Sequence, residues 1–323
     1  MSSTNQSIQY HELQDFEFHN GVILPKVRIA YKIINPHNSK IAVVHTCFKG
    51  RIDRTLTHAD RAFRNHKVIV IALFGNGESS SPSNTPDFPK TLEYMDCVAA
   101  QYKFLTAGLN VKEIDVMLGF SMGGQITYHW ITTHPAFVKK AVIVCSSAKT
   151  SPHNYQFLEG PRAALANAKS EEQGKRAFGK AYSAWLTSAE WFDQEKFTEL
   201  GFGSLSEWDE MTTGKGYDDW TGDDLLIMLG MWQRGDIARC VPGSQGSLEA
   251  ALKTIRSKVL LMPSETDQYF RPYVNVREAK SFQSERHAQV AIVPSIWGHI
   301  VGGGANPVDV TWMDEKIVSF LEA

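Results

Sequence analysis

Ser121 stands between two glycines in the run Gly119-Phe-Ser-Met-Gly123, and this setting suits nucleophilic chemistry. The apolar run 115–118 before it is long enough for one buried strand, and residues 125–134 after it carry apolar side chains at helical spacing. A strand, a Gly-x-Ser-x-Gly turn and a helix form a nucleophile elbow, which exposes the serine hydroxyl beside backbone N–H groups at a helix N-terminus. The same pentapeptide can also be a glycine-rich turn around an inert serine, so the interpretation depends on partners downstream. With those partners, we predict that Ser121 is a catalytic nucleophile.

The candidate base is His299. A serine hydroxyl becomes a good nucleophile only when a base removes its proton and a third group fixes the tautomer of that base. Behind a nucleophile elbow these partners follow along the chain in the order serine, acid, histidine. Of the eleven histidines, only His299 lies in the last loop after a predicted strand, residues 289–293, with a glycine, Gly298, beside it to allow close approach.

The candidate acid is Asp267, which follows the predicted strand 258–262 after a short loop. This offset would place its carboxylate at the same sheet edge as Ser121. Glu265, two residues earlier, competes for the role. An acidic residue after a strand is most often a cap or a solvated turn, and the chain order favours Asp267 as the group that orients His299.

An oxyanion hole needs two N–H donors. One is predicted to be the amide of Met122, the residue after the nucleophile. The second is expected from the loop after the predicted strand 41–45, at Cys47 or Phe48. Cys47 as a nucleophile is the competing interpretation, but no base is visibly assigned to it, which favours a small packed thiol.

The elements that must position these residues alternate between strand and helix. Residues 16–34 are typical of an antiparallel hairpin, and 41–45 and 67–73 of buried strands. Helices are predicted at 57–64 and, with amphipathic spacing, at 91–107. After the elbow come a strand at 141–145, a helix at 273–282 and a last helix at 308–321. This alternation predicts the α/β class, with a mainly parallel eight-stranded sheet and helices on both faces.

Between about residues 150 and 243 strand-like runs vanish and helical patterns dominate. We therefore predict a core formed by 1–149 and 244–323, and a helical lid, 150–243, inserted between the sixth and seventh strands. Such a segment would cover the carboxyl ends of the strands, where open α/β sheets place their sites.

The predicted lid holds five of the eight tryptophans in under a third of the chain. These aromatic side chains could pack between lid helices or wall an apolar pocket. We predict that four lid residues contact the substrate: Trp185, Leu186, Trp191 and Trp232.

Composition narrows the class of partner. The chain has 323 residues and a formal net charge of −2, which gives no electrostatic footprint for nucleic acid or an anionic membrane. No apolar run approaches a membrane span, and the first thirty residues show no signal peptide. The cysteines lack CxxC spacing and are typical of reduced thiols in a cytoplasmic protein. They are Cys47, Cys97, Cys145 and Cys240.

The acidic run 217–224 could suggest a metal site, because it contains two Asp-Asp pairs. Acidic pairs before an apolar helix are more simply N-terminal caps that match the helix dipole. The loop pattern of an oxygen-only metal site is missing here. We expect neither a metal nor a cofactor.

With these residues in place, the chain resembles an α/β-hydrolase of the homoserine O-acetyltransferase type over nearly its full length. The resemblance rests on four runs: Gly119–Gly124, Ser147–Pro152, Glu265–Phe270 and Trp297–His299. In that family the serine, aspartate and histidine of these motifs form a triad, and acetyl passes from acetyl-CoA through the serine to homoserine. The resemblance thus implies the same triad as the chain order: Ser121, Asp267 and His299.

Two departures from the family pattern point away from homoserine. The Gly-Ser-Thr-Gly-Pro run that homoserine transferases carry after the fourth strand is replaced here by Gly75–Pro82. The lid arginine that helps them hold the amino acid is replaced by Leu186, and a carboxylate without a cationic partner would be poorly held. The chain therefore resembles the hydrolase-like fungal and bacterial branch, some members of which serve secondary metabolism.

Three functions follow as hypotheses. The leading one is a serine hydrolase that cleaves an ester, thioester or related acyl bond of a medium-sized, largely apolar small molecule. The alternative is an O-acyltransferase that passes the acyl group to an alcohol, and the third is a non-catalytic ligand-binding protein on the same fold. The lid could also carry a homodimer contact.

Overall fold

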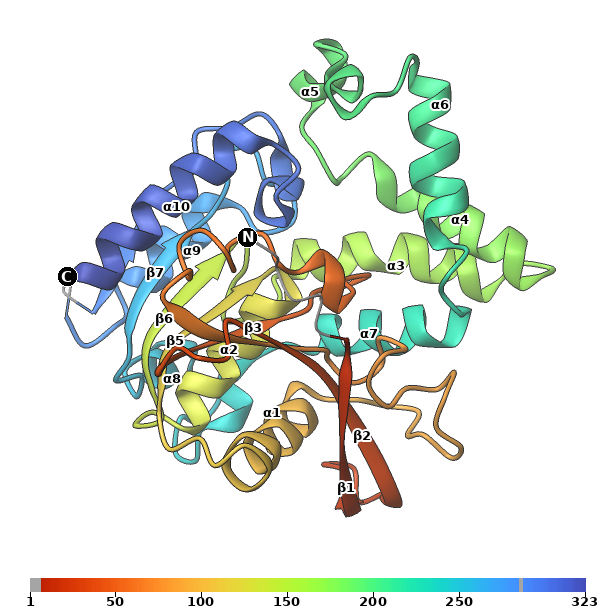
Figure 1. Ribbon diagram of the computed structural model, residues 1–323. Helices are drawn as coiled ribbons and strands as arrows, with labels where there is room; N and C mark the ends of the chain where they lie inside the picture. The colour runs from red at the N-terminus through yellow and green to blue at the C-terminus, as the bar shows by residue number, and fades with distance from the viewer. Residues whose placement is uncertain (1–6, 285–286) are drawn as a thin grey trace.

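The computed structural model describes residues 7–284 and 287–323, and Figure 1 shows them as a central sheet flanked by helices. Eight strands of this part of the chain form one sheet in the order β1-β2-β4-β3-β5-β6-β7-β8. Their bounds are β1 Gln9–Glu17, β2 Ile23–Ile34, β3 Lys40–His45, β4 His66–Ile71, β5 Ile114–Phe120, β6 Val138–Val144, β7 Lys258–Met262 and β8 Ala288–Val290. The predicted α/β class and the eight-stranded sheet are confirmed.

The strand order sets which loops meet. β1 and β2 form an antiparallel hairpin, and β2 is also antiparallel to β4. From β3 to β8 neighbouring strands pair in parallel. Because β3 lies between β4 and β5, the strand order reverses at the β3–β5 pair, and open α/β sheets place their sites at such a reversal. The loop after β3 therefore lies beside the turn after β5, which carries Ser121.

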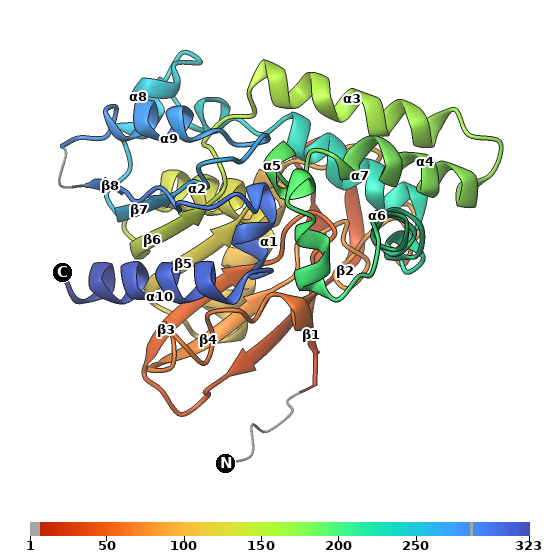
Figure 2. The ribbon, with the colours of Figure 1, turned by 90° about the horizontal axis from the view of Figure 1, so that it is seen from above.

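Helices cover both faces of the sheet. Alternate residues of β5 point to opposite faces: Met117 belongs to one buried core cluster, and Val116 and Leu118 belong to the other. Figure 2 shows α10 on the face opposite α2, α8 and α9. The bounds are α1 Tyr94–Lys103, α2 Met122–Thr133, α8 Leu248–Leu252, α9 Pro272–Ala279 and α10 Pro307–Glu322.

The segment predicted as a lid, residues 150–243, connects β6 to β7 and is helical, and Figure 1 shows α4, α5 and α6 standing away from the sheet. We call it the lid segment. A serine or threonine begins each of its five α-helices and accepts a hydrogen bond from the third backbone N–H of the helix. These helices are α3 Pro152–Ala166, α4 Glu171–Ser183, α5 Ala189–Asp193, α6 Leu205–Asp209 and α7 Gly222–Gln233.

Two predicted elements differ in the structure. Residues 57–64, predicted as a helix, form successive turns, with Ala59 N–H bonded to Leu56 and Phe63 N–H bonded to His58. The His58 side chain bonds Asp314 of α10 at 2.8 Å, so a contact distant in sequence holds this segment. The last strand, predicted at 289–293, ends at Val290, and a single bridge follows it.

The acidic side chains of the run 217–224 do not supply the N-cap of α7 that was predicted. Thr221 is the N-cap of α7, while Asp223 and Asp224 lie in its first turn, where negative charge matches the helix dipole. The Asp224 carboxylate accepts hydrogen bonds from the amide and hydroxyl of Ser83, at 3.0 and 2.6 Å. It therefore ties the lid segment to the loop after β4.

The four cysteines are free thiols. Among the described residues, every helix is too short or too polar to cross a bilayer.

Candidate active site

Ser121 sits in a strained turn between β5 and α2. Its φ of 56° and ψ of −123° are unusual for a residue with a side chain. The turn closes so tightly that a Cβ on Gly119 would lie 1.8 Å from the carbonyl oxygen of Gly123. A Cβ on Gly123 would in turn lie 2.9 Å from the carbonyl oxygen of His45. The glycines of the motif therefore make the turn possible, and the turn presents the serine hydroxyl.

The structure brings Ser121, His299 and Asp267 together from three different loops. His299 Nε2 lies 2.9 Å from Ser121 Oγ, and His299 Nδ1 lies 2.8 Å from Asp267 Oδ2. The other oxygen of Asp267 accepts the backbone N–H groups of Tyr269 and Phe270, at 2.7 and 3.1 Å. Both carboxylate oxygens are thus hydrogen-bonded, which fixes the direction of the bond to His299.

The competing carboxylate is placed elsewhere, because Glu265 is exposed whereas Asp267 is 2% exposed. The ring of His299 is held by aromatic side chains, with Phe120 at 4.8 Å and Tyr269 at 4.7 Å between ring centroids. Its backbone N–H donates to the Leu186 carbonyl at 2.9 Å, so the lid segment contacts the histidine loop directly.

Cys145 joins Asp267 and His299 as a group of buried, potentially metal-ligating atoms within 4.8 Å of one another. Burial, and then the charge of Asp267, raise the pKa of the Cys145 thiol well above its ordinary value. A thiol binds metals as the thiolate, and both Asp267 and His299 are already paired. These three side chains are therefore suited to a hydrogen-bonded network and not to a metal site.

The predicted oxyanion donors are available. Among the described residues, the amides of Met122, Cys47 and Phe48 donate no hydrogen bond to another protein group. Cys47 and Phe48 line the same cavity as Ser121. Burial raises the pKa of the Cys47 thiol to about 12, so the thiol stays protonated near neutral pH and is a poor competing nucleophile.

The cavity beside Ser121, which we call the catalytic cavity, has a volume of about 210 Å³. Of the four lid residues predicted to contact the substrate, only Leu186 lines it. The other lid residues of its wall are tyrosines, Tyr182 and Tyr217, which we did not predict. The remainder of the wall comes from the core: Cys47, Phe48, Lys49, Phe120, Ser121, His299, Ile300, Gly303 and Ala305.

The three tryptophans of that prediction do not line this cavity and pack against other side chains. Trp191 is fully buried against Trp208 and Trp297, and Trp185 packs on Phe157 with ring centroids 5.0 Å apart. Trp232 is also fully buried, stacks on Phe270 at 5.6 Å and lies behind the cavity wall. Their large apolar surfaces hold the lid segment together and against the core.

Lys49 adds a cation that was not among the predicted site residues. No arginine stands at Leu186, but Lys49, in the loop after β3, is among the residues that line the catalytic cavity, and its Nζ lies over the ring of Tyr217, which lines the same cavity. The charge therefore comes from the core loop instead of the lid segment.

Glu278 of α9 is a buried carboxylate in a hydrogen-bond network that reaches the backbone of Ser121. It accepts hydrogen bonds from Tyr128 Oη at 2.8 Å, from the Ala148 N–H at 2.9 Å and from Asn275 Nδ2 at 3.0 Å. Asn275 also donates to the carbonyl of Ser146, whose hydroxyl donates to the carbonyl of Ser121 at 2.7 Å. Burial raises the pKa of Glu278 to about 7.

This raised pKa predicts a pH-dependent stability. Because folded Glu278 holds its proton to a higher pH than unfolded Glu278, its contribution to stability is fully present below about pH 4.5 and is lost as the pH rises through about 7. Relative to Glu278→Gln, which mimics the neutral acid, the wild type should lose about 3 kcal/mol of unfolding free energy over that range. Urea unfolding of both proteins at pH 5 and pH 8 measures the difference. A difference independent of pH would contradict the assignment.

The chain is similar to known hydrolases along most of its length. A family model described as the alpha/beta hydrolase fold matches residues 46–301. The chain is 27% identical to the ethyl acetate hydrolase of Pseudomonas veronii, over 94% of this chain and 92% of that one. It is 23% identical to a homoserine O-acetyltransferase of Methanococcoides burtonii, over 90% of this chain and 69% of the other. The structure of the acetyl esterase MekB superposes with a TM-score of 0.89 at 25% identity, covering 100% of this chain and 99% of that one.

Proposed function

The chain belongs to the α/β-hydrolase family, and we propose that it is a serine esterase in which Ser121, His299 and Asp267 form the catalytic triad. One observation carries the proposal: a buried chain of hydrogen bonds runs from Asp267 through His299 to Ser121 Oγ at the wall of a cavity. Ester cleavage agrees with the relatives, since the ethyl acetate hydrolase and the acetyl esterase are both esterases by name.

Acylation begins at Ser121. As Oγ attacks the ester carbonyl carbon, His299 Nε2 takes the hydroxyl proton, and Asp267 stabilises the imidazolium without itself becoming protonated. The carbonyl oxygen becomes an oxyanion, which the amide of Met122 and that of Cys47 or Phe48 are placed to bind. When the C–O bond breaks, His299 returns the proton to the departing alcohol and the acyl group remains on Ser121.

Deacylation repeats these steps with water. His299 removes a proton from a water molecule as that water attacks the acyl-enzyme, and the proton then passes to Ser121 Oγ as the acid is released. If an alcohol enters the site in place of water, the same intermediate yields a new ester. Acyl transfer is therefore the second candidate, favoured by the similarity to a homoserine O-acetyltransferase.

Product analysis separates the two. The protein is incubated with p-nitrophenyl acetate, and separately with acetyl-CoA and homoserine, and the products are identified by mass spectrometry. Free acetate from the ester, with no O-acetylhomoserine, supports the esterase. Rapid O-acetylhomoserine formation would establish the transferase instead.

The position of Leu186 in the wall of the catalytic cavity predicts how the enzyme selects the length of the acyl chain. Leu186→Ala enlarges the catalytic cavity, so the rate ratio of p-nitrophenyl octanoate to p-nitrophenyl acetate should rise by about tenfold. The backbone carbonyl of Leu186, which bonds His299, is retained in this variant.

Trp185→Ala is the matched control, because Trp185 is the adjacent residue and packs on Phe157 outside the cavity. It should lower Tm and leave the ratio unchanged. A larger change of the ratio in Trp185→Ala than in Leu186→Ala would show that Trp185, and not Leu186, contacts the acyl chain.

A further inference from the structure

Lys49 is held in an uncommon backbone conformation beside the nucleophile. Its φ is 57°, in the left-handed region, and a turn bond from Gly50 N–H to the Cys47 carbonyl at 2.9 Å closes the loop around it. Its Nζ lies 3.8 Å from the ring centroid of Tyr217, over the face of the ring. The loop thus directs a cation along the wall of the catalytic cavity.

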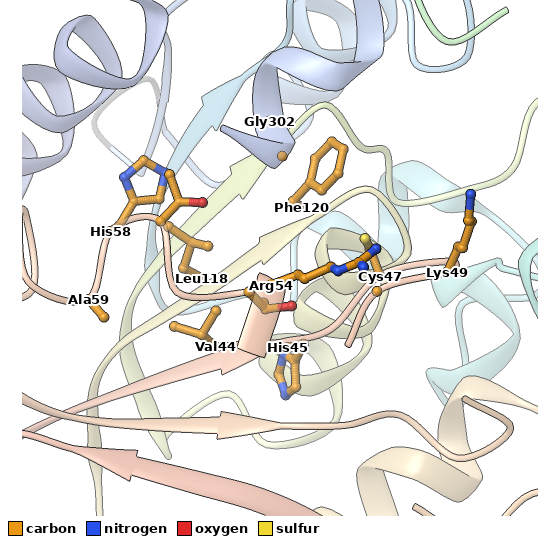
Figure 3. Close-up of a pocket in the computed structure, with 14 residues that line it drawn as sticks. Val44, His45, Cys47, Lys49, Arg54, His58, Ala59, Leu118, Phe120 and Gly302 are labelled. Carbon is orange, nitrogen blue, oxygen red and sulfur yellow. The ribbon is translucent and has the colours of Figure 1, made fainter. Parts of the chain in front are cut away.

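A second cavity of about 180 Å³ adjoins the first, and we call it the side cavity (Figure 3). Cys47, Lys49, Phe120 and Gly303 line both cavities, so the two share a wall. The side cavity also contains Arg54, whose side chain extends toward Cys47 in Figure 3.

The two cations lack anionic partners. In residues 7–284 and 287–323 neither Lys49 nor Arg54 forms an ion pair, while the nearby Asp53 pairs with Lys32 at 2.7 Å. Burial, and then the positive charge of Arg54, lower the pKa of Lys49 to about 8. A desolvated ammonium beside a second cation is costly, and a bound carboxylate would relieve that cost.

We propose that Lys49, at the boundary of the catalytic and side cavities, binds an anionic group of the ester substrate, so that the preferred substrates are esters that also carry a carboxylate. The inference rests on the proposed esterase function and names its substrate class. The carboxylate can belong to the acyl half, as in the monoester of a dicarboxylic acid, or to the alcohol half, as in the acetate of a hydroxy acid. In either case water adds across the ester bond, and the acid and the alcohol are released with the second carboxylate unchanged.

A structural role is the competing explanation for Lys49. Its ammonium touches the lid segment, since a Cβ on Gly216 would lie 2.9 Å from Lys49 Nζ, and the contact with Tyr217 could simply hold that segment closed. Such a role would affect charged and neutral esters alike. A test must therefore compare matched substrates.

Two pairs of esters place the charge on either half of the substrate. Monoethyl glutarate is compared with ethyl 5-methylhexanoate, in which an isopropyl group replaces the carboxylate. Sodium 4-acetoxybutanoate is compared with 4-methylpentyl acetate in the same way. Acid release is followed by pH-stat titration for the wild type, Lys49→Met, Lys49→Arg and Lys112→Met. Lys112 is exposed and precedes β5 at the end of the strand opposite Ser121, so its variant controls for net charge.

The wild type should prefer the charged ester in one pair, and that pair identifies the half that Lys49 contacts. Lys49→Met should lower the charged-to-neutral ratio of kcat/KM by about ten- to a hundredfold, mainly through KM. Lys49→Arg should retain part of the preference, and Lys112→Met all of it. Melting temperatures of the four proteins show whether each variant is folded.

Two results would overturn the proposal in different ways. If the wild type cleaves the neutral esters with no preference for a charged one, or if Lys49→Met slows both members of a pair equally, Lys49 is a lid contact and the esterase function stands. If the wild type cleaves no ester at all, the esterase function fails and this inference fails with it.

Discussion

Ser121→Ala is expected to lower kcat/KM for ester hydrolysis by about 10⁴- to 10⁶-fold, because no acyl-enzyme can form without the hydroxyl. The fold should persist, since the elbow depends on the close approach of Gly119 and Gly123 and not on Oγ. Initial rates with p-nitrophenyl acetate give the loss in activity, and thermal unfolding gives the stability.

Gly119→Ala serves as the contrasting variant for this prediction. An added Cβ would overlap the carbonyl of Gly123, so this change should destabilise the protein as well as inactivate it. If Ser121→Ala kept an activity within tenfold of the wild type, Ser121 would not be the catalytic nucleophile.

Asp267→Asn is the second change with a large expected effect, a loss of about 10⁴-fold in kcat. The Asn amide can present an N–H where the carboxylate accepts one, so His299 would be held in the wrong tautomer and its Nε2 could not take the serine proton. Initial rates with p-nitrophenyl acetate measure the loss.

Glu265→Gln is the matched control, because Glu265 lies two residues away but is exposed. It should leave kcat within about twofold of the wild type, as surface changes away from the site usually do. If Glu265→Gln were the more damaging of the two, the acid would have been assigned to the wrong carboxylate.

The fold and the candidate triad could be predicted because their signals are local. Ser121, Asp267 and His299 each follow a predicted strand after a short loop, and in a parallel sheet such loops share one edge. The order along the chain then selects among carboxylates and histidines. The structure brings these three side chains within hydrogen-bond distance.

The pocket wall could not be predicted in the same way. Trp191 and Leu186 lie five residues apart in one lid segment, and only tertiary packing decides that the indole is buried while Leu186 faces the cavity. The concentration of tryptophans indicated burial correctly but not what they are buried against. Helix packing likewise decides that His58 bonds Asp314, which holds residues 57–64 in turns.

The role of Lys49 was missed for a related reason. A lysine in a loop is normally solvated, and nothing in its neighbours along the chain shows that the lid segment will partly bury it. Whether a cation has an anionic partner depends on how several loops, distant in sequence, pack together. The surroundings of Lys49 can therefore be seen only in the folded structure.

The central claim is that Ser121 is an activated nucleophile, and covalent labelling tests it most directly. The wild type is incubated with a fluorophosphonate, its intact mass is measured, and the modified peptide is sequenced by mass spectrometry. The account predicts one adduct per chain, located on Ser121, that forms much more slowly in Asp267→Asn and is absent in Ser121→Ala. No adduct on the folded wild type, or an adduct on another residue such as Cys47, would contradict it.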